Sequence, residues 1–441
     1  MLSIRIGKAM QEVMTVQAER IARETKCSRR ASILGGAGLV QTLVFGYLRN
    51  RLATCEELAQ TAAILGYPVS PQAIDERCTP ETAECLRRLV EEAVQKAITA
   101  DKCVSPLLAR FASVCLQDSS VVGLPDALQE QWRGCETWTD HGGKAALKIQ
   151  TRFDLGCGAV RVRLEQGRDS DHRTPLQTEE IEAGSLHLRD LGYFDLDVFQ
   201  EMARKKAYFI SRVQDNTALL KPNGERIDLA KFLGKNKDNR VDMRVLLGVE
   251  HRLRFRLIAV RVPPEIARRR RQTVLEKARK KQYTPSAEKL ALCAWNIYVT
   301  NAPVKLLSLE EVLVLARMRW QIELIFKLWK SHGGLGATRS ANPWRILCET
   351  FAKLLGQLIQ HWILIQVTWS EPRRSLRKAA GAVRAFAACL AASLNDVHAL
   401  AAVLDNIALA LTRTGRVEKR RKHPSAHQLL ANPIVCGYKT Q

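Results

Sequence analysis

The amino-acid sequence predicts a mixed α/β protein that is helical at both ends. Residues 1–105 carry helical periodicity and turn signals, and residues 346–441 return to that pattern. Between them, short apolar runs typical of strands alternate with helical runs. Because strands and helices that alternate along a chain form layers around a common sheet, we expect the middle of the chain to hold the core.

Composition and charge narrow the class of protein. A chain of 441 residues with 46% hydrophobic and 26% charged residues is long enough for about two to four globular domains. Its net charge of +23 favours a polyanionic partner. Nucleic acid is the commonest such partner, and an anionic membrane surface is the alternative.

Cysteine usage and hydropathy indicate a cytoplasmic protein. The 12 cysteines are scattered singly, without the clustering that a zinc site or a disulfide framework needs. No secretory signal is expected, because the first residues contain no continuous apolar run. The uncharged stretch 31–48 holds four glycines as well as Gln41 and Thr42, so we expect a packed helix or helix pair there rather than a membrane span.

Residues 1–105 are expected to form a helical N-terminal DNA-binding region. The stretch RLATCEELAQTAAILGYPVSPQAIDERC predicts a helix, a turn and a second helix, with Ser70 as the N-cap and Pro71 as the first helical residue. This pattern is typical of a helix-turn-helix and equally of a plain helical hairpin.

Two aspartates close predicted strands in residues 106–213. The run FASVCLQD predicts a strand that ends at Asp118, and SLHLRD predicts one that ends at Asp190. Between and after them, KIQTRFDLGCGAVRVRLEQG predicts a hairpin, and DVFQEMARKKAYFISRV predicts a helix followed by a strand. A carboxylate at the end of an apolar strand is costly to bury unless a positive group pairs with it.

Residues 214–292 are strongly basic. The run HRLRFRLIAVRV alternates, which predicts an antiparallel strand with Arg252, Arg254 and Arg256 on one face. The next segment, PPEIARRRRQTVLEKARKKQY, predicts a basic helix. Such charge runs are usually solvated faces, but together with the net charge they favour contact with phosphates.

A strand and a long helix are predicted in residues 293–345. The strand ALCAWNIYVTNAP carries Trp295, and the helix contains RWQIELIFKLWK. On an ideal helix Arg319, Glu323 and Lys330 share one face, since steps of four and seven residues return to within about 40° and 20° of the starting direction. Taken alone, that pattern favours a surface ion pair. A neighbouring apolar stripe would dock the helix onto a sheet: Leu315, Met318, Ile322, Ile325 and Trp329.

Asp118, Asp190 and Glu323 together form a candidate metal site. Two aspartates on neighbouring strands and a glutamate on a helix can hold two Mg²⁺ ions about 4 Å apart, an arrangement that supports in-line phosphoryl transfer. Hard oxygen ligands favour magnesium over zinc, with Mn²⁺ as the expected substitute.

The motifs around these carboxylates resemble those of bacterial DDE transposases of the insertion-sequence-four type. CLQDSSVVGLP resembles the first aspartate motif of that family, HLRDLGYFDLDVF the second, and WNIYVTNAP the strand before the glutamate helix. The family signature is a tyrosine, two residues, an arginine, three residues, a glutamate, six residues and a lysine. This chain matches the signature at Arg319, Glu323 and Lys330, and has Ala316 where the tyrosine is expected.

The resemblance covers roughly residues 105–370 and implies a domain organisation. It implies an RNase H-like catalytic core in two parts, 106–213 and 293–345, interrupted by a β-rich basic insertion at 214–292. The core would be followed by a helical C-terminal region with a basic tail, 346–441.

The resemblance also implies roles for individual residues. Asp118, Asp190 and Glu323 would be the catalytic metal ligands, and Arg319 and Lys330 would contact phosphates of the transposon end. Tryptophans at two positions would hold a base that is flipped out of the stack, because an indole face replaces lost base stacking. These are Trp295 and Trp320, and the alternative is that both are core aromatics next to a strand and a helix.

The implied function is cut-and-paste transposition of an insertion sequence. The partners would be double-stranded DNA, namely the terminal inverted repeats of the element and the target DNA, and a second copy of the chain in a synaptic homodimer. The location would be the bacterial cytoplasm, in association with the nucleoid and without membrane contact. The alternative is a host DNA nuclease, or a domesticated DNA-binding protein without catalysis, on the same fold.

Overall fold

The computed structural model describes residues 2–28, 33–96, 98–100, 105–135, 143–214, 217–369, 371, 373–417 and 424–433. The chain divides into two compact units, each assembled from separate stretches of sequence. The first unit comprises Met1–Cys103, Ser119–Ser170 and Gln321–Lys419, and the second comprises Val104–Asp118, Asp171–Trp320 and Arg420–Gln441. The segment boundaries expected from the sequence stay a prediction, and residues 418–423 and 434–441 of the region with the basic tail lie outside the described residues.

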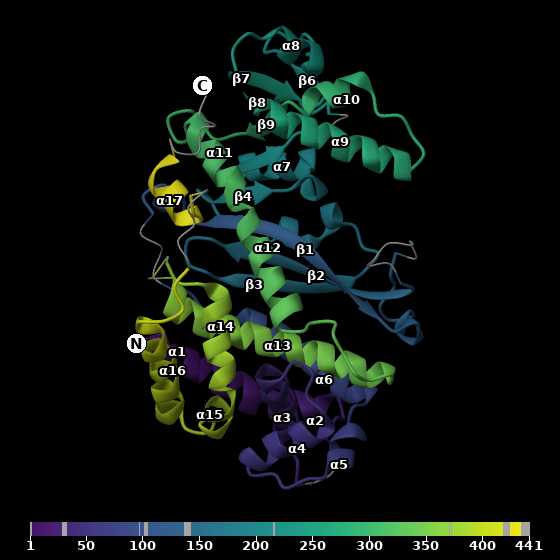
Figure 1. Ribbon diagram of the computed structural model, residues 1–441, viewed down its shortest axis with the longest axis vertical. Helices are drawn as coiled ribbons and strands as arrows, with labels where there is room; N and C mark the ends of the chain where they lie inside the picture. Colours follow the sequence, from purple (N-terminus) through teal and green to yellow (C-terminus); the bar gives the residue numbers. More distant parts are fainter. Residues whose placement is uncertain are drawn as a thin grey trace. The chain divides into compact units, whose positions relative to one another are not determined.

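Within the residues that the structure describes, nine strands form the sheet, in the order β3-β2-β1-β4-β5-β9-β8-β7-β6. The long strand β1 (Val114–Leu124) belongs to both units, with its first residues in the second unit and its last residues in the first. Strands β1, β4 and β5 run parallel to one another, whereas β2 with β3 and the pairs from β5–β9 to β6–β7 are antiparallel. A large sheet with helical flanks confirms the predicted mixed α/β class (Figure 1).

The first unit is mainly helical. It contains the predicted hairpin, formed by β2 (Ala145–Asp154) and β3 (Val160–Gln166), whose turn holds Gly158 at φ +77°. Its helices are α1 (Leu2–Gln11), α2 (Ala18–Glu24), α3 (Gly36–Arg49), α4 (Cys55–Ile64), α5 (Pro71–Asp75), α6 (Pro80–Gln95), α13 (Pro343–Thr368), α14 (Leu376–Ala385), α15 (Ala387–Ala392), α16 (Val397–Thr412) and most of α12 (Trp320–Lys327).

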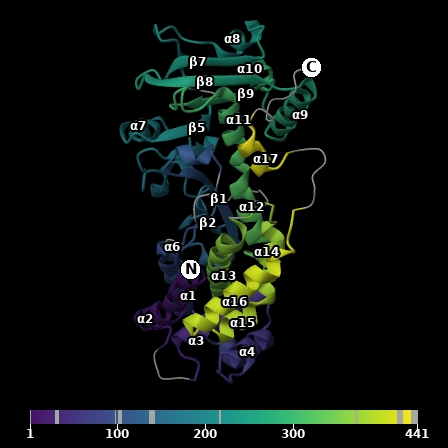
Figure 2. The same cartoon turned by 90° about the vertical axis from the view of Figure 1, so that its left-hand side faces the viewer.

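Helix α13 organises the first unit. Nearly all its residues beyond the first turn are buried, because α3, α6 and α14 pack around it. The N-terminal and C-terminal regions meet in this unit, since α1 packs along α16 (Figure 2). The stretch that includes α3 is a buried helix, as expected, and among the described residues no helix is long and apolar enough to cross a bilayer.

The predicted helix–turn–helix pattern lies in the first unit. The hydroxyl of Ser70 accepts a hydrogen bond from the Ala73 amide, and Pro71 is the first residue of α5, so the predicted cap is confirmed. Helix α5 spans only five residues, however. Every cysteine that the structure describes is a free thiol.

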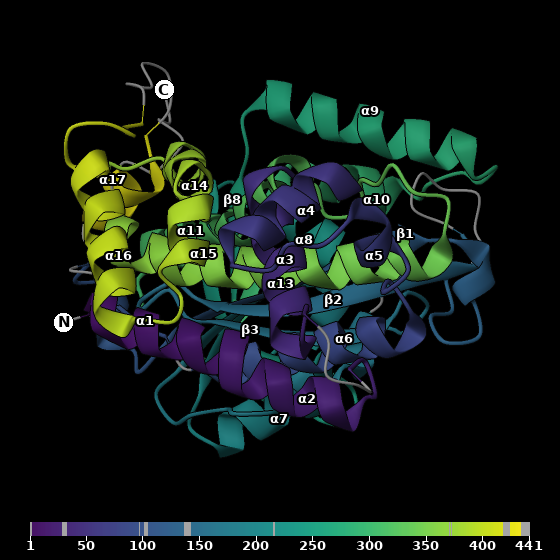
Figure 3. The same cartoon turned by 90° about the horizontal axis from the view of Figure 1, so that it is seen from below.

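The second unit alternates strands and helices. Its strands beyond β1 are β4 (Leu186–Arg189), β5 (Tyr208–Arg212), β6 (Leu219–Leu220), β7 (Arg240–Leu247), β8 (Leu253–Arg261) and β9 (Trp295–Thr300). Its helices are α7 (Leu196–Arg204), α8 (Leu229–Lys235), α9 (Pro264–Lys280), α10 (Ala287–Leu292), α11 (Leu309–Met318) and α17 (Ala426–Ala431). Figures 2 and 3 show α7 and α9 on opposite faces of these strands.

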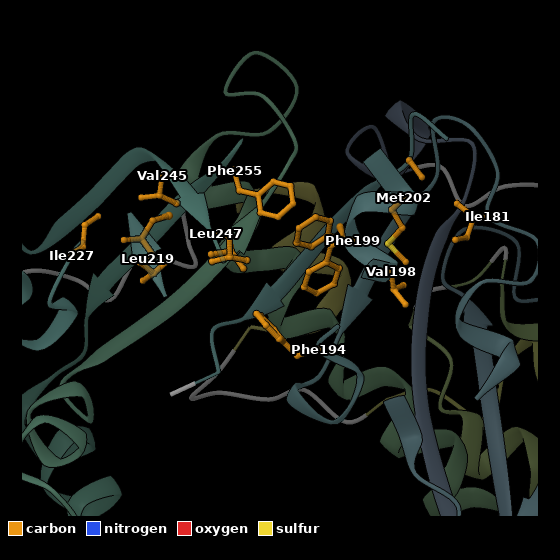
Figure 4. Close-up of a cluster of buried hydrophobic side chains, with 14 residues drawn as sticks. Ile181, Phe194, Val198, Phe199, Met202, Leu219, Ile227, Val245, Leu247 and Phe255 are labelled. Carbon is orange, nitrogen blue, oxygen red and sulfur yellow. The ribbon is translucent and has the colours of Figure 1, made fainter. Parts of the chain in front are cut away.

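One face of the second unit's sheet carries an aromatic core. Phe199 of α7 stacks on Phe209 of β5 with ring centroids 4.0 Å apart, and Phe255 of β8 meets Phe209 edge-on (Figure 4 labels Phe199 and Phe255). Burial of these rings stabilises the packing of α7 on the sheet. Since side chains alternate along a strand, residues next to Phe209 face the other side, where α11 contacts β5.

Candidate functional site

Asp118 and Asp190 lie side by side on neighbouring parallel strands. The β1–β4 register pairs Val114 with Leu186 and Leu116 with Leu188, so the next residues on that face are Asp118 and Asp190. Asp190 directly follows the last residue of β4, as predicted. The prediction that Asp118 ends its strand was wrong, because the apolar run after it continues β1 to Leu124.

The guanidinium of Arg319 contacts both aspartates. Its Nη1 lies 3.3 Å from Oδ2 of Asp118, and its Nε lies 3.8 Å from Oδ1 of Asp190. The three side chains are between 24% and 36% exposed, so the group is open to solvent. A cation at this place offsets the cost of holding two carboxylates next to each other.

The helical segment around Arg319 consists of three successive elements rather than one regular helix. Helix α11 begins with a capping box between Ser308 and Glu311, and α12 begins one residue after Arg319. The segment Leu328–His332 is a π-helix, so ideal α-helical spacing does not give the direction of Lys330. The predicted apolar stripe is confirmed, since these side chains are all buried: Leu315, Met318, Ile322, Ile325 and Trp329.

Glu323 and Lys330 belong to the first unit. Glu323 lies on α12 with an intermediate exposure. The Nζ of Lys330 donates a hydrogen bond of 2.7 Å to the carbonyl of Val121, in the last part of β1. Burial lowers the pKa of Lys330, because a buried ammonium loses its hydration. Of the five residues predicted as metal ligands or as contacts to phosphates of the transposon end, the second unit therefore holds Asp118, Asp190 and Arg319, and the first unit holds Glu323 and Lys330.

A small cavity of about 230 Å³ adjoins Asp190 within the second unit. Ala316 and Arg319 line it from the helix, and the strands contribute polar side chains that the sequence analysis did not single out. These are Arg212, Asn296 and Tyr298, joined by Arg270 from α9. Register could have found two of them, because Arg212 continues the row of Asp118 and Asp190 on β5 and pairs with Tyr298 on β9.

The three arginines predicted to share one strand face differ in their surroundings, and the first of them, Arg252, precedes β8. Arg252 and Arg254 are exposed, as a DNA-contacting face requires. Arg256 is 6% exposed and donates to both carboxylate oxygens of Asp242 and to the carbonyls of Ala302 and Leu307. Its predicted role in DNA binding is therefore wrong for this structure, because the guanidinium is buried and already bound on several sides.

The two predicted tryptophans also differ. Trp320 is 55% exposed beside Arg319, so its indole face is available to a ligand. Trp295 is 5% exposed, packs with Leu233, and has the guanidinium of Arg261 4.5 Å from its ring centroid. Strand alternation places Trp295 on the opposite face of β9 from Tyr298. Trp320 is thus the more accessible of the two.

The donor set suits a hard cation. Asp118 and Asp190 offer carboxylate oxygens on adjacent strands, the ligand type that Mg²⁺ and Mn²⁺ prefer. Among the residues that the structure describes, no cluster of three or more histidine, cysteine, aspartate or glutamate side chains is preassembled for a metal.

Comparisons with known proteins identify the family. The model of the transposase DDE domain matches residues 109–357, which is more than half of the chain. The transposase for insertion sequence element IS231F of Bacillus thuringiensis subsp. israelensis is 24% identical over 444 residues, covering 93% of this chain and 91% of that protein. The transposase for IS1151 of Clostridium perfringens is 23% identical over 389 residues, covering 81% and 80%.

A third relative supports the same conclusion. The putative transposase InsL for insertion sequence element IS186A of Escherichia coli (strain K12) is 30% identical over 244 residues, covering 53% of this chain and 65% of that protein. The chain belongs to the transposase DDE domain family, as predicted. Its function is that of a transposase of the bacterial insertion-sequence type, and it is an enzyme.

Proposed function

We propose that this transposase moves its element by cut-and-paste transposition. It binds the terminal inverted repeats, hydrolyses the phosphodiester bond at each end, and directs the freed 3′-hydroxyls against target DNA. The observation that carries the proposal is the placement of Arg319 against Asp118 and Asp190 on adjacent parallel strands. Two carboxylates next to a phosphate-binding cation are the parts that phosphoryl transfer on DNA requires.

We infer further that the catalytic core is RNase H-like. The strand order β3-β2-β1-β4-β5, with a β2–β3 hairpin and with β4 and β5 parallel to β1, supports this assignment. The segment after β5 adds β6, β7 and β8 before β9 returns to β5, which supports an insertion at residues 214–292.

The metal ligands in this proposal are Asp118, Asp190 and Glu323. Two Mg²⁺ ions, or Mn²⁺ ions, would activate the attacking oxygen and stabilise the leaving one. The chain's own residues position the DNA: Arg319 binds a phosphate next to the carboxylates, and Lys330 holds a second one. Trp320 offers its exposed face to an unstacked base.

Phosphate contacts outside the site come from the basic insertion. Exposed arginines and lysines lie along α9, and two further arginines are exposed, Arg252 just before β8 and Arg254 within it. Each neutralised phosphate releases counterions, so binding of the terminal repeat should weaken steeply as salt rises. Binding that does not respond to salt would rule out these phosphate contacts by the basic insertion.

We propose that the active form is a homodimer that joins two element ends.

The decisive test uses Glu323. The full-length protein is incubated with Mg²⁺ and a labelled linear DNA that carries the element's end, and nicking and strand transfer are followed. Glu323→Ala should abolish both while DNA binding stays near that of the wild type. The exposed Glu130 provides a matched control, since Glu130→Ala should cut normally. Cutting by Glu323→Ala at the wild-type rate would refute the ligand assignment.

A further inference from the structure

The cavity beside Asp190 has the size and the charge of an anion site. At about 230 Å³ it is smaller than the roughly 300–1,000 Å³ of pockets that take a whole ligand, so it suits one small group rather than a nucleotide. Four arginines line it with a single acidic residue, Asp190: Arg189, Arg212, Arg270 and Arg319. Arg319 also contacts Asp118, so the lining and its nearest partner together hold four guanidiniums and two carboxylates. A site with this excess of positive charge selects an anion.

Sheet register explains how the cavity meets the catalytic row. Arg189 of β4 pairs with Ser211 of β5, so the next residue on each strand is Asp190 or Arg212. Arg212 in turn pairs with Tyr298 of β9. The row across the sheet therefore runs from carboxylates to a guanidinium and then to a phenol, and it holds these groups on rigid strands.

Helix α9 closes the cavity through Arg270. Its Nη2 donates a 2.7 Å hydrogen bond to Oδ1 of Asn296, and its Nη1 donates to the carbonyl of Trp295 at 3.2 Å. Asn296 also lines the cavity. These bonds fix the guanidinium plane, so less rotamer entropy is lost when it binds an oxyanion.

We propose that this cavity binds one backbone phosphate of the DNA strand that is cut, close to the scissile bond, and that Arg270 and Tyr298 are the positioning residues. The proposal rests on the proposed function. It assigns α9 a specific task, because Arg270 links the basic insertion to the row of Asp190. Ala316 lines the cavity with a small side chain.

The experiment removes one DNA charge at a time. Duplexes carrying the terminal repeat are made with a single neutral methylphosphonate at successive linkages around the cleaved bond. Affinities for the full-length protein are measured by fluorescence anisotropy without divalent metal, so that no DNA is cut. For the wild type, we expect one linkage near the cleaved bond to weaken binding about tenfold when neutralised.

The same scan is then repeated on variants. Arg270→Gln should lose the sensitivity at that linkage and keep the others, and Tyr298→Phe should reduce it. Arg270→Lys keeps the charge but lacks the planar guanidinium, so its sensitivity at that linkage should lie between those of the wild type and Arg270→Gln. Such a graded loss is not expected from misfolding. The exposed Arg268 on the same helix is not among the residues that line the cavity. Arg268→Gln should therefore lower overall affinity through the lost charge but leave the sensitivity at that linkage unchanged.

Two failures can be told apart. Linkage profiles for Arg270→Gln and Tyr298→Phe that match the wild type at every position would overturn the phosphate site. Absence of any cutting of the unmodified duplex by the wild type in Mg²⁺ would instead count against the proposed function.

Discussion

Two arginines of the second unit contact aspartates but differ in their burial and in the length of the contacts. Arg256 lies in the sheet with a side chain that is 8% exposed, and it holds Asp242 through two hydrogen bonds of 2.6 and 3.1 Å. Arg319 is 25% exposed and reaches its two aspartates at 3.3 and 3.8 Å. The first guanidinium is buried and bridges strand, loop and carboxylate, whereas the second keeps long contacts in an accessible place. Residue type and sequence spacing do not separate these roles, but burial does.

The largest expected effect comes from the buried arginine. Arg256→Ala leaves Asp242 and two carbonyls without their partner, so we expect a loss of about 3–5 kcal/mol in the free energy of unfolding. Chemical denaturation measures it. Arg254→Ala, two residues away on an exposed position, should change stability by less than about 0.5 kcal/mol. Equal losses of stability in Arg256→Ala and Arg254→Ala would show that burial does not separate the two arginines.

A second buried group extends the comparison to the first unit. His361 of α13 is buried against Phe153 and Trp369, and its Nε2 lies 2.7 Å from the carbonyl of Gly158 at the β2–β3 turn. Burial lowers the pKa of His361 to about 4. Above pH 6.5 the ring is neutral in both the folded and the unfolded chain, so its protonation does not change the free energy of unfolding there.

Below pH 6.5 the imidazole of His361 binds a proton in the unfolded chain but stays neutral in the folded chain until the pH approaches about 4. Stability should therefore fall as pH drops from about 6.5 to 4, by about 3 kcal/mol from this residue. The difference in unfolding free energy between wild type and His361→Gln, measured across that range, isolates the contribution. A difference that does not change with pH would show that His361 is not held neutral.

The accessible arginine should affect catalysis instead of stability. Arg319→Ala should reduce end cleavage about a hundredfold, because a preorganised donor to the reacting phosphate is lost. Its midpoint of thermal unfolding should fall only slightly, since Arg319 and both aspartates are partly exposed and solvent screens the charges of the two carboxylates. Single-turnover cleavage and calorimetry are measured together. Arg317→Ala, on the exposed side of the same helix, is the matched control.

The smallest effect is expected for the exposed tryptophan. Trp320→Ala should weaken binding to DNA with an unpaired base next to the cut by about 1–3 kcal/mol, with little change in stability. Trp295→Ala should instead destabilise the fold, because its indole fills a core. Fluorescence of 2-aminopurine at the unpaired position reports stacking. Quenching that is lost in Trp295→Ala but kept in Trp320→Ala would reverse these roles.

Local patterns predicted most of the elements. Alternation around Gly158 predicted the hairpin, and Ser70 with Pro71 predicted the start of a helix, because caps and turns depend on neighbours in the chain. The same patterns placed a strand end at Asp118, which is wrong, because the local sequence does not show how far β1 continues in the sheet. Strand β4 ends at Arg189, while β1 continues to Leu124, so only one of the two aspartates follows a strand end.

By itself, the sequence determined the α/β class, the basic character and the residues that carry the family resemblance, because these depend on composition and spacing. Only the tertiary structure decided which charged side chains are accessible. Sheet pairing buried Arg256 against Asp242, and parallel register set Asp118 beside Asp190. The cavity of Arg270 and Tyr298 also arises from register and from a helix packed over strands. Contacts between distant segments set burial, and burial separates a structural cation from one that can bind DNA.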